Sequence, residues 1–413
     1  MNLALKIANR LRLNPEGKGR RQSPGVTVAV AGIAVSVAVM LLTLAVVKGF
    51  QNQVKQKVMG FDSQISVSRY VTNPADTLFL DFSDSLCAVI KSSLPENAVL
   101  SPAITCTSLL KTDEDYFGLQ LVADDNTLHN YIADYVIQGG DTLLPDDNSL
   151  VVSSLVAKRL NLNTGDRIFA HFFINGGVKT RRLTVSAIYD TSFGERDKRV
   201  AFCSLPLLRS VYGIAENQAE KVNITGLDFD AVQPLSESLQ VSLAEAFYEQ
   251  RVSDIYQVDS VLRTGAAYFG WLDLLDTNVV VIVILMSLVA AFTLVASLFI
   301  LVLERVRMIG VLKSLGTTNS FISRIFMFLA MRIVALGLFA GNAAGLLIIF
   351  LQDKFHIIPL DPDSYYLDYV PMDLSLTNFI LLNLSAIFAA WLVLILPSMI
   401  VSRISPAATI RYE

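Results

Sequence analysis

The segment LFILVLERVRMIGVLKSLGTTNSFISRIF, from Leu298 to Phe326, decides how the rest of the chain is organised. An apolar run typical of a membrane span meets Glu304 and Arg307, continues as a mixed apolar and basic stretch, and breaks at Gly316. A helix needs no such stretch merely to leave a bilayer. The segment therefore indicates a chain that crosses a membrane and has a further task at the membrane surface.

The composition of the chain agrees with a membrane protein. Of its 413 residues, 53% are hydrophobic and 17% are charged, yet long polar stretches separate the apolar ones. This balance predicts a membrane protein with a sizeable water-exposed part. The net charge of -4 and the lack of a basic stripe argue against a nucleic-acid partner.

Four apolar stretches are long enough to cross a bilayer as helices, and they cover residues 26–47, 279–303, 326–350 and 376–397. The first is too long for a signal-peptide core and ends without a small-residue cleavage site, so we expect a retained anchor. The predicted fold class is a membrane protein with four transmembrane α-helices and a large α+β domain, residues 48–277, inserted between the first two.

Basic residues set the orientation of these spans. Lysine and arginine are frequent in residues 1–25, in the segment 304–324 and in the tail 398–413, whereas the loop 353–375 holds five aspartates and a single lysine. The positive-inside rule then places both termini and the segment 304–324 in the cytoplasm, and the inserted domain and the loop 353–375 outside. The tyrosines of that loop suit the aromatic belt at the outer interface; they are Tyr365, Tyr366 and Tyr369.

The inserted domain shows strand and turn patterns. SQISVSRY and RRLTVSAIY alternate as half-buried strands do, and FFINGGVKT predicts a hairpin that turns at Asn175-Gly176-Gly177. SSLVAKRLNLNTGD predicts a short helix capped near Ser153, followed by a turn at 163–166.

We find no catalytic or metal-binding motif in the sequence. GxSxG and HExxH are absent, and EGKGRR lacks the spacing of a P-loop. The histidines are far apart, and the odd number of cysteines without a CxxC pair favours small buried residues over a disulfide framework; these residues are His129, His171, His356, Cys87, Cys106 and Cys203. We therefore expect a non-catalytic chain without a metal or cofactor of its own, so that another chain would bind any ATP and Mg.

The charged stretch that follows the second span allows two interpretations. It is either a helix end that trails into a loop or a lever that docks into a groove on a cytoplasmic partner, with apolar side chains inward and charges at the rim. Its apolar arc is interrupted by Lys313 and consists of Val306, Ile309, Leu312 and Leu315.

Three glycines recur every fourth residue in the third span, at Gly337, Gly341 and Gly345. Small residues at this spacing let a second helix approach closely. We expect packing against the fourth span of the same chain, with a dimer contact as the alternative.

Five pieces of the sequence, in order, resemble the FtsX-like ABC transporter permeases, and among them the lipoprotein-releasing (Lol-type) permeases. They are residues 32–70 with GFQ at Gly49-Phe50-Gln51, SLVVSSLVAKRLNLNTGDRI, VAAFTLVASLFILVLERVRMIGVLKSLGTT, DPDSYYLDYVPMDLSLTNF and the tail SRISPAATIRYE. The resemblance covers nearly the whole chain.

The resemblance implies a permease subunit of the MacB/FtsX type in the bacterial inner membrane, with its large domain in the periplasm. It would pair with a second copy or a relative, above two separate ATPase subunits that bind ATP and Mg. ATP binding would shift the cytoplasmic coupling segment, and the spans would pass this motion to the periplasmic domain. The residues expected to couple to the ATPase are Glu304, Arg307, Ile309, Leu312, Lys313 and Gly316.

In Lol-type relatives the cargo is a triacylated lipoprotein. Burial of three acyl chains of about 15 methylenes each in the bilayer is worth on the order of 35 kcal/mol of free energy. The lipid must therefore pass directly to another apolar cavity. This requires a periplasmic carrier and suggests a lipid cleft between the paired first and second spans. Candidate cleft residues, for each of which ordinary packing or lipid contact is the alternative, are Val39, Met40, Thr43, Phe292 and Leu298.

One departure from the Lol pattern leaves the cargo open. Carrier recruitment in that family uses an extended hairpin, and the corresponding segment between Phe172 and Arg182 looks short. One alternative is an FtsX-type regulatory subunit that controls a cell-wall hydrolase. Another is a MacB-type efflux permease, although only about 25 residues precede the first span, too few for the usual fused ATPase. A sensor would be expected to carry a cytoplasmic output domain.

Overall fold

A computed structural model describes residues 24–71, 78–112, 115–140, 142–174, 176–361 and 365–393. The chain divides into two compact units. The helix-bundle unit comprises the described parts of Met1–Asn52, Leu272–Pro359 and Tyr369–Glu413, and the head unit comprises Gln53–Trp271 and Leu360–Asp368. Most of the predicted segment 1–25 and all of the tail 398–413 lie outside the described residues.

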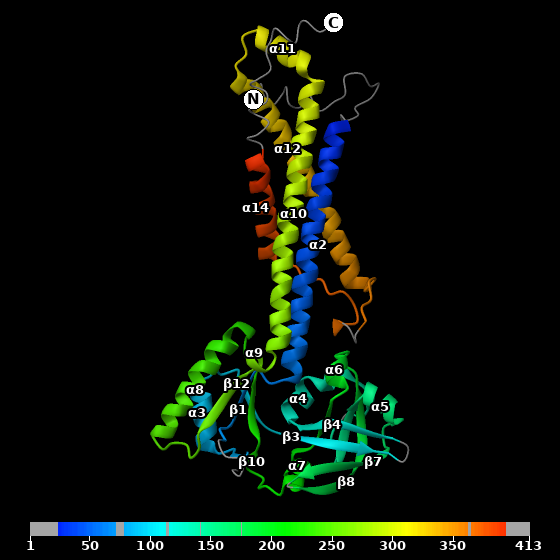
Figure 1. Ribbon diagram of the computed structural model, residues 1–413, viewed down its shortest axis with the longest axis vertical. Coiled ribbons are helices and arrows are strands. Elements are labelled where there is room, and N and C mark those ends of the chain that lie inside the picture. Colours follow the sequence, from blue (N-terminus) through cyan, green and yellow to red (C-terminus); the bar gives the residue numbers. More distant parts are fainter. Residues whose placement is uncertain are drawn as a thin grey trace. The chain divides into compact units, whose positions relative to one another are not determined.

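The helix-bundle unit is built from long apolar helices (Figure 1). They are α2 (Pro24–Phe61, whose last residues enter the head unit), α10 (Ala266–Glu304, whose first residues belong to the head unit), α11 (Val306–Ser314), α12 (Asn319–Phe355) and α14 (Leu376–Val393). By length and composition α2, α10 and α12 are each able to cross a membrane. The shorter α14 falls in the predicted span 376–397, of which residues 394–397 lie outside the described chain.

Two of these helices are much longer than a bilayer needs. With 38 residues in α2 and 39 in α10, each is about 57 Å long, nearly twice a hydrocarbon core of about 30 Å. The predicted spans 26–47 and 279–303 lie inside them. About half of each helix therefore has to lie outside the hydrocarbon.

The bundle buries one continuous apolar core. It includes Val37 and Met40 of α2, Leu298 of α10 and Ile333 of α12, together with Leu382 of α14. In its most apolar window α10 is only 11% buried, against 33% for α2 and α12. A large apolar face of α10 is thus left for lipid or for another protein.

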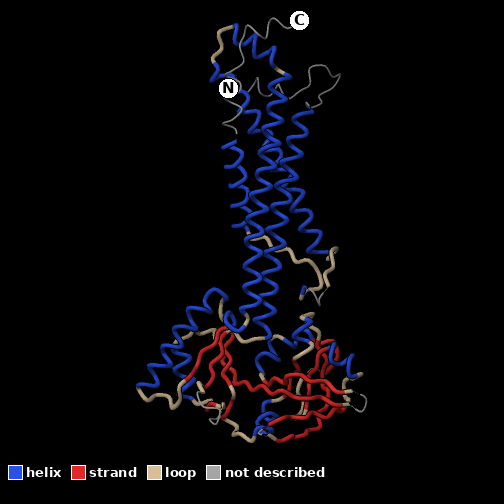
Figure 2. Tube along the Cα trace, viewed as in Figure 1, coloured by secondary structure: helices blue, strands red, loops and turns tan. Residues whose placement is uncertain are grey.

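All described strands belong to the head unit (Figure 2). Ten of them form one sheet in the order β12-β1-β11-β3-β4-β9-β6-β8-β5, with β7 joining β3 to β8. The strands are β1 (Ile65–Arg69), β3 (Val99–Lys111), β4 (Tyr116–Ala123), β5 (Val136–Gly139), β6 (Ser149–Ser153), β7 (Arg167–Ile174), β8 (Gly177–Tyr189), β9 (Val200–Cys203), β11 (Lys221–Thr225) and β12 (Tyr256–Ser260). A separate pair consists of β2 (Leu80–Asp81) and β10 (Gln218–Ala219).

One half of the head sheet closes on itself. The pairings run β3-β4-β9-β6-β8-β7 and return from β7 to β3, so six strands form a ring. The ring encloses an apolar core that includes Leu110, Leu121 and Phe172. Short helices accompany it: α4 (Asp125–Asn130), the 3-10 helix η1 (Ile132–Tyr135), α5 (Ser154–Leu160), α6 (Gly194–Asp197) and α7 (Leu205–Tyr212).

The other half of the head is an open antiparallel sheet, β12-β1-β11-β3. Ile65 and Val67 of β1 are fully buried, as the alternation of SQISVSRY predicts. The helices of this half are α3 (Asp84–Ser92), the 3-10 helix η2 (Phe229–Ala231), α8 (Val232–Tyr248) and α9 (Val261–Thr264). Helix α8 packs on β12 and α3 packs on α8.

Two local predictions for the head are confirmed. Ser153 caps α5, since its hydroxyl accepts a hydrogen bond from the Val156 amide, and Asp166 accepts one from the Asn163 amide in the turn that follows. The strands β7 and β8 meet at a two-residue turn in which Gly176 has a φ of +74°. Asn175 lies outside the described residues.

The outer loop between α12 and α14 corrects one expectation. Residues 360–368 belong to the head unit, and the ring of Tyr366 packs edge-on against Phe193 rather than lying at a lipid interface. Tyr369 stacks on His356 within the helix-bundle unit. Of the three predicted belt residues only Tyr365 remains strongly exposed.

Candidate functional site

The coupling segment is a separate helix between two turns. Helix α10 ends at Glu304, and Arg305, with φ -115° and ψ 15°, interrupts the helix before α11 begins at Val306. The sequence suggested that the span runs straight into the coupling segment, and the break at Arg305 corrects this expectation.

Gly316 ends α11 as predicted. It has a φ of +85°, its amide donates to the Lys313 carbonyl, and the Thr317 amide donates to the Leu312 carbonyl. This is the Schellman pattern, in which a residue in the left-handed region closes a helix and glycine fits without strain. The Thr318 hydroxyl then caps α12.

The two faces of α11 differ. Ile309 is fully buried in the core of the bundle, and Leu312 packs against that core. Val311 and Leu315 point the other way and are 55% and 76% exposed. The structure therefore gives Ile309 and Leu312 a role in holding α11, and leaves the side chains of Val311 and Leu315 exposed.

The charged residues proposed for coupling are spread along the same segment. Glu304 and Gly316 are exposed, and Lys313 is half-buried. The side chain of Arg307 lies outside what the structure describes. Val311 is missing from the residues predicted from the sequence because the predicted apolar arc of this segment took every third residue. The spacing of four between Val311 and Leu315 could have placed both residues on one face of the helix.

The proposed cleft residues do not form one surface. Met40 and Leu298 are buried in the core, Val39 and Thr43 are half-buried, and Phe292 is 73% exposed on α10. Only Phe292 lies on the open apolar face of α10. A lipid contact there remains a proposal, whereas Met40 and Leu298 are packing residues.

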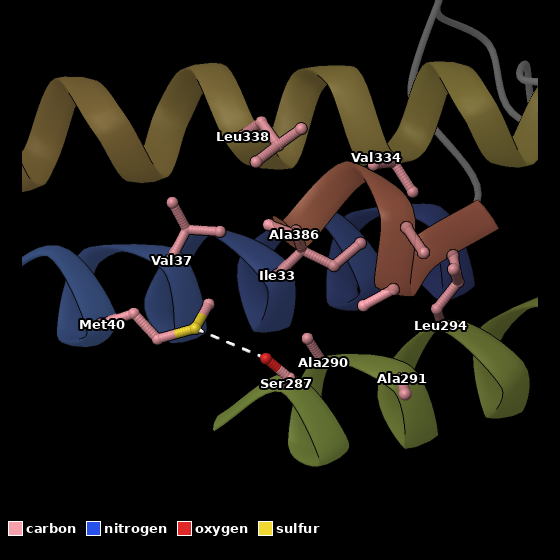
Figure 3. A pocket seen from close by; sticks show the side chains of 12 residues that line it. Ile33, Val37, Met40, Ser287, Ala290, Ala291, Leu294, Val334, Leu338 and Ala386 are labelled. Carbon is pink, nitrogen blue, oxygen red and sulfur yellow. Dashed lines mark hydrogen bonds between the residues drawn. The ribbon is translucent and has the colours of Figure 1, made fainter. Parts of the chain in front are cut away.

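A small cavity lies inside the bundle where α2, α10, α12 and α14 meet (Figure 3). Its volume is about 30 Å³, and alanines such as Ala290, Ala291 and Ala386 leave the space open. The Ser287 hydroxyl points across it and donates to the Met40 sulfur at 3.7 Å. The cavity is too small for an acyl chain, so this cavity is not the predicted lipid cleft.

The glycines of α12 face α2 and not α14, which corrects the predicted partner helix. A Cβ atom at Gly337 would lie 2.7 Å from the Ile33 side chain, and one at Gly341 would lie 2.6 Å from the Ala34 carbonyl oxygen. Gly345 lies against Leu41 in the same way.

Helix α14 is held by a different contact with α12. The Asn342 amide donates to the Asn383 side-chain oxygen at 2.6 Å. An amide pair of this kind is a favourable link between helices in an apolar surrounding.

The GFQ sequence joins three segments at one end of the bundle. A Cβ atom at Gly49 would lie 2.7 Å from the Pro371 carbonyl oxygen, so only glycine lets this segment approach. The buried amide of Gln51 donates to the Leu272 carbonyl of α10 at 2.9 Å. Lys48 donates to the Gln51 side chain and pairs with Asp276 of α10, both at 2.9 Å. The motif therefore has a structural role in fastening α2 to α10 and to the approach to α14.

The strands β7 and β8 form a regular antiparallel hairpin. Eight residue pairs connect the strands, from Arg167 opposite Thr184 to Ile174 opposite Gly177. Near its tip Phe173 and Val178 face each other across the strands, 62% and 59% exposed.

The described residues hold no group of three or more metal-ligating side chains. The three cysteines are free thiols, with Cys106 and Cys203 buried. Among the described residues we see no cluster of side chains arranged for catalysis. The notable features are the helix contacts and the exposed apolar faces.

Long membrane helices on either side of an α+β head define a class of permease, and comparison with known families identifies it. Residues 26–266 match the MacB-like periplasmic core domain, and residues 280–406 match the FtsX-like permease C-terminal domain. Because the first match alone covers more than half of the chain, the chain belongs to the FtsX-like permeases with a MacB-like periplasmic core domain.

Relatives along the full length are lipoprotein-releasing system transmembrane proteins. The chain is 22% identical over 402 residues to LolC of Xylella fastidiosa, with 93% of each chain covered. It is 22% identical to LolE of Haemophilus influenzae, over 94% of this chain and 96% of that one. The solved periplasmic region of MacB from Actinobacillus actinomycetemcomitans aligns with 52% of this chain at 12% identity and a TM-score of 0.33.

Family membership fixes the general role. The chain is a multi-pass membrane protein with a periplasmic MacB-like domain and an ABC transporter permease of the FtsX/MacB type. Such permeases are typically non-catalytic transmembrane subunits, so the family implies a separate ABC ATPase as partner.

Proposed function

We propose that this chain is a permease subunit of an ABC transporter that extracts lipoproteins from the outer leaflet of the bacterial inner membrane and passes them to a periplasmic carrier. The observation that carries the proposal is the similarity to LolC along 93% of both chains. It spans the membrane helices, the coupling segment and the head together, so the proposal does not rest on the similarity of a single module.

In this proposal the ATPase binds the outward face of α11. Val311 and Leu315 supply the apolar contact, and Glu304, Arg307 and Lys313 supply charges at its rim. ATP and Mg bind to the ATPase subunits, and this chain contributes no cofactor. The buried Ile309 ties α11 to the bundle, so that movement of α11 shifts the spans.

The lipid path lies on the open face of α10, where Phe292 is exposed, and is completed by a second permease subunit, either a copy of this chain or a relative. Because exposing the acyl chains to water would cost on the order of 35 kcal/mol, they need an apolar route at every stage. The carrier then docks at the tip of the β7–β8 hairpin, where Phe173 and Val178 offer an apolar surface.

Depletion of the protein tests the proposal. Inner and outer membranes are separated after depletion, and lipoproteins are expected to accumulate in the inner membrane. Wild-type protein restores sorting. Phe173→Ser with Val178→Ser is expected to restore it poorly, whereas Tyr248→Ser, which changes an exposed aromatic residue on α8 of the same head, restores it fully.

Unchanged lipoprotein sorting combined with a division or cell-wall defect would overturn the proposal in favour of an FtsX-type regulator. Accumulation of lipoproteins with full rescue by the hairpin double variant would keep the release function and reject the hairpin as the docking site.

A further inference from the structure

Lys57, near the end of α2 in the head unit, ties two distant segments together. Its ammonium group donates to the carbonyls of Thr191 and Ser192, at 2.6 and 3.3 Å, and to the carbonyl of Tyr366, at 2.9 Å. A lysine has three donors, and here each finds a backbone carbonyl. One side chain therefore joins α2, the 190–197 segment of the head and the outer loop between α12 and α14.

Aromatic packing reinforces this junction. The Tyr366 ring lies edge-on to the Phe193 ring at 5.2 Å between centroids. The centroid of the Tyr268 ring lies 6.0 Å from that of Tyr366. Phe193 is fully buried and also packs against Phe61 at the end of α2. The outer loop thus inserts a side chain into the head rather than resting on its surface.

The backbone at the junction adopts rare conformations. Ser192 and Tyr366 have φ angles of +55° and +62°, although neither is glycine. Residues other than glycine hold this region only where surrounding contacts impose it, and such residues concentrate at functional points. Here the carbonyls of both residues are bound by Lys57.

The other end of the outer loop is fastened to α2 as well, within the helix-bundle unit. The Asp373 amide donates to the Ala45 carbonyl at 3.0 Å, and the Asn52 amide donates to the Asp373 carboxylate at 2.6 Å. Residues 45 to 57 of α2 therefore hold both ends of one connection between α12 and α14.

We propose that Lys57 and Tyr366 form a latch that makes the outer loop a third mechanical link to the head, in addition to α2 and α10. Through it, displacement of α12 and α14 reaches the 190–197 segment directly. This proposal rests on the proposed function in one respect, which is that ATP drives the displacement of α12 and α14. It does not depend on which cargo is transported.

Amide hydrogen exchange of the full-length protein in nanodiscs, bound to its co-purified ATPase, tests the latch. Exchange is compared with and without Mg²⁺ and a non-hydrolysable ATP analogue. In the wild type we expect the nucleotide to change exchange at residues 190–197 and 365–368 together. In Lys57→Met we expect residues 365–368 to exchange about tenfold faster without nucleotide, and the response at 190–197 to fall by at least about half.

Two further variants complete the test. Lys55→Met is the matched control, because Lys55 lies on the same helix but stands over the Phe229 ring at 4.3 Å, and it is expected to behave as wild type. Tyr366→Leu removes the aromatic insertion without touching α2, and is expected to reproduce Lys57→Met if that variant folds poorly.

The proposal is overturned if both latch variants keep the full nucleotide response at 190–197, or if the wild type shows no response there. The readout needs no cargo. A wild-type complex that responds to nucleotide at both segments but releases no lipoprotein would therefore reject the proposed function and retain the latch.

Discussion

At the scale of single residues, Asp197 is a buried acid at the end of the 190–197 segment, which Lys57 binds through the Thr191 and Ser192 carbonyls. It is 1% exposed, and the Thr191 hydroxyl donates to one carboxylate oxygen at 2.7 Å while the amides of Thr191 and Phe193 donate to the other. Burial raises the pKa of the Asp197 carboxyl above its ordinary value of 3.8, and these hydrogen bonds oppose the rise only in part. The neighbouring carboxylate of Asp190 acts in the same direction as burial.

This environment predicts a pH dependence of stability. Because the pKa is higher in the folded than in the unfolded state, the contribution of this carboxyl to stability is full in acid and is lost as the pH rises through the folded pKa. Asp197→Asn does not titrate. The free energy of unfolding of the full-length protein in detergent, followed through its apparent melting temperature, should therefore fall relative to that of Asp197→Asn as the pH rises above the ordinary pKa of 3.8. The fall should be about 1.4 kcal/mol for each unit of difference between the folded and unfolded pKa values.

Thr191→Val provides the companion measurement. Loss of the hydroxyl removes a donor to the ionised carboxylate, so the decline with pH should be steeper than in the wild type. Parallel pH profiles for wild type and Asp197→Asn would show that this carboxyl has the same pKa in both states.

At the scale of elements, the contact between α2 and α12 depends on the absence of side chains. At Gly341 a Cβ atom would lie 2.6 Å from the Ala34 carbonyl oxygen and 2.8 Å from the Val37 Cβ atom. Gly341→Leu must push the two helices apart, which is expected to cost about 1–3 kcal/mol or more. A lower apparent melting temperature in detergent would report this loss.

Gly270 serves as the matched control, since it also lies in a long helix but a Cβ atom there meets nothing within 4 Å. Gly270→Leu should be tolerated. Equal effects of the two substitutions would contradict close packing of α12 on α2.

The two faces of α11 predict two different kinds of defect. Val311→Asp with Leu315→Asp places charge on the exposed face and is expected to weaken binding of the ATPase at least about tenfold with little change in melting temperature. Ile309→Ala removes a buried side chain and is expected to destabilise the bundle by about 2–4 kcal/mol. Co-purification of the ATPase, together with thermal unfolding, separates the two effects.

Val241→Asp, on the exposed face of α8 in the head, is the control for added charge and should leave ATPase binding intact. If the double α11 variant still binds the ATPase with wild-type affinity, the ATPase binds another surface of the chain.

At the scale of the whole molecule, the sequence predicted what depends on local pattern. The alternation of β1, the cap at Ser153, the hairpin turn at Gly176 and the end of α11 at Gly316 are each set by residues close together in the chain. The position of the α+β domain between the first two spans followed from hydropathy alone.

What the sequence could not predict depends on distant contacts. The spacing of Gly337 and Gly341 indicates a close helix neighbour but not which one, and three other predicted spans were available. Whether Ile309 faces the bundle or a partner depends on the break at Arg305, which turns α11 relative to α10. Tyr366 was assigned to a lipid interface because a tyrosine ring suits a membrane interface and a protein core equally well, and the sequence does not distinguish the two.

The place of β1 in the head sheet has a consequence for biogenesis. Its neighbours are β11 and β12, so Ile65 pairs with Ile224 and Ser260. During synthesis at roughly 5–20 residues per second, β1 waits roughly 10–30 s for its first neighbour with both backbone edges open. We therefore expect chaperones to shield the nascent domain during export, and we expect quality-control proteases to remove chains truncated before residue 221, which leave an unsatisfied strand.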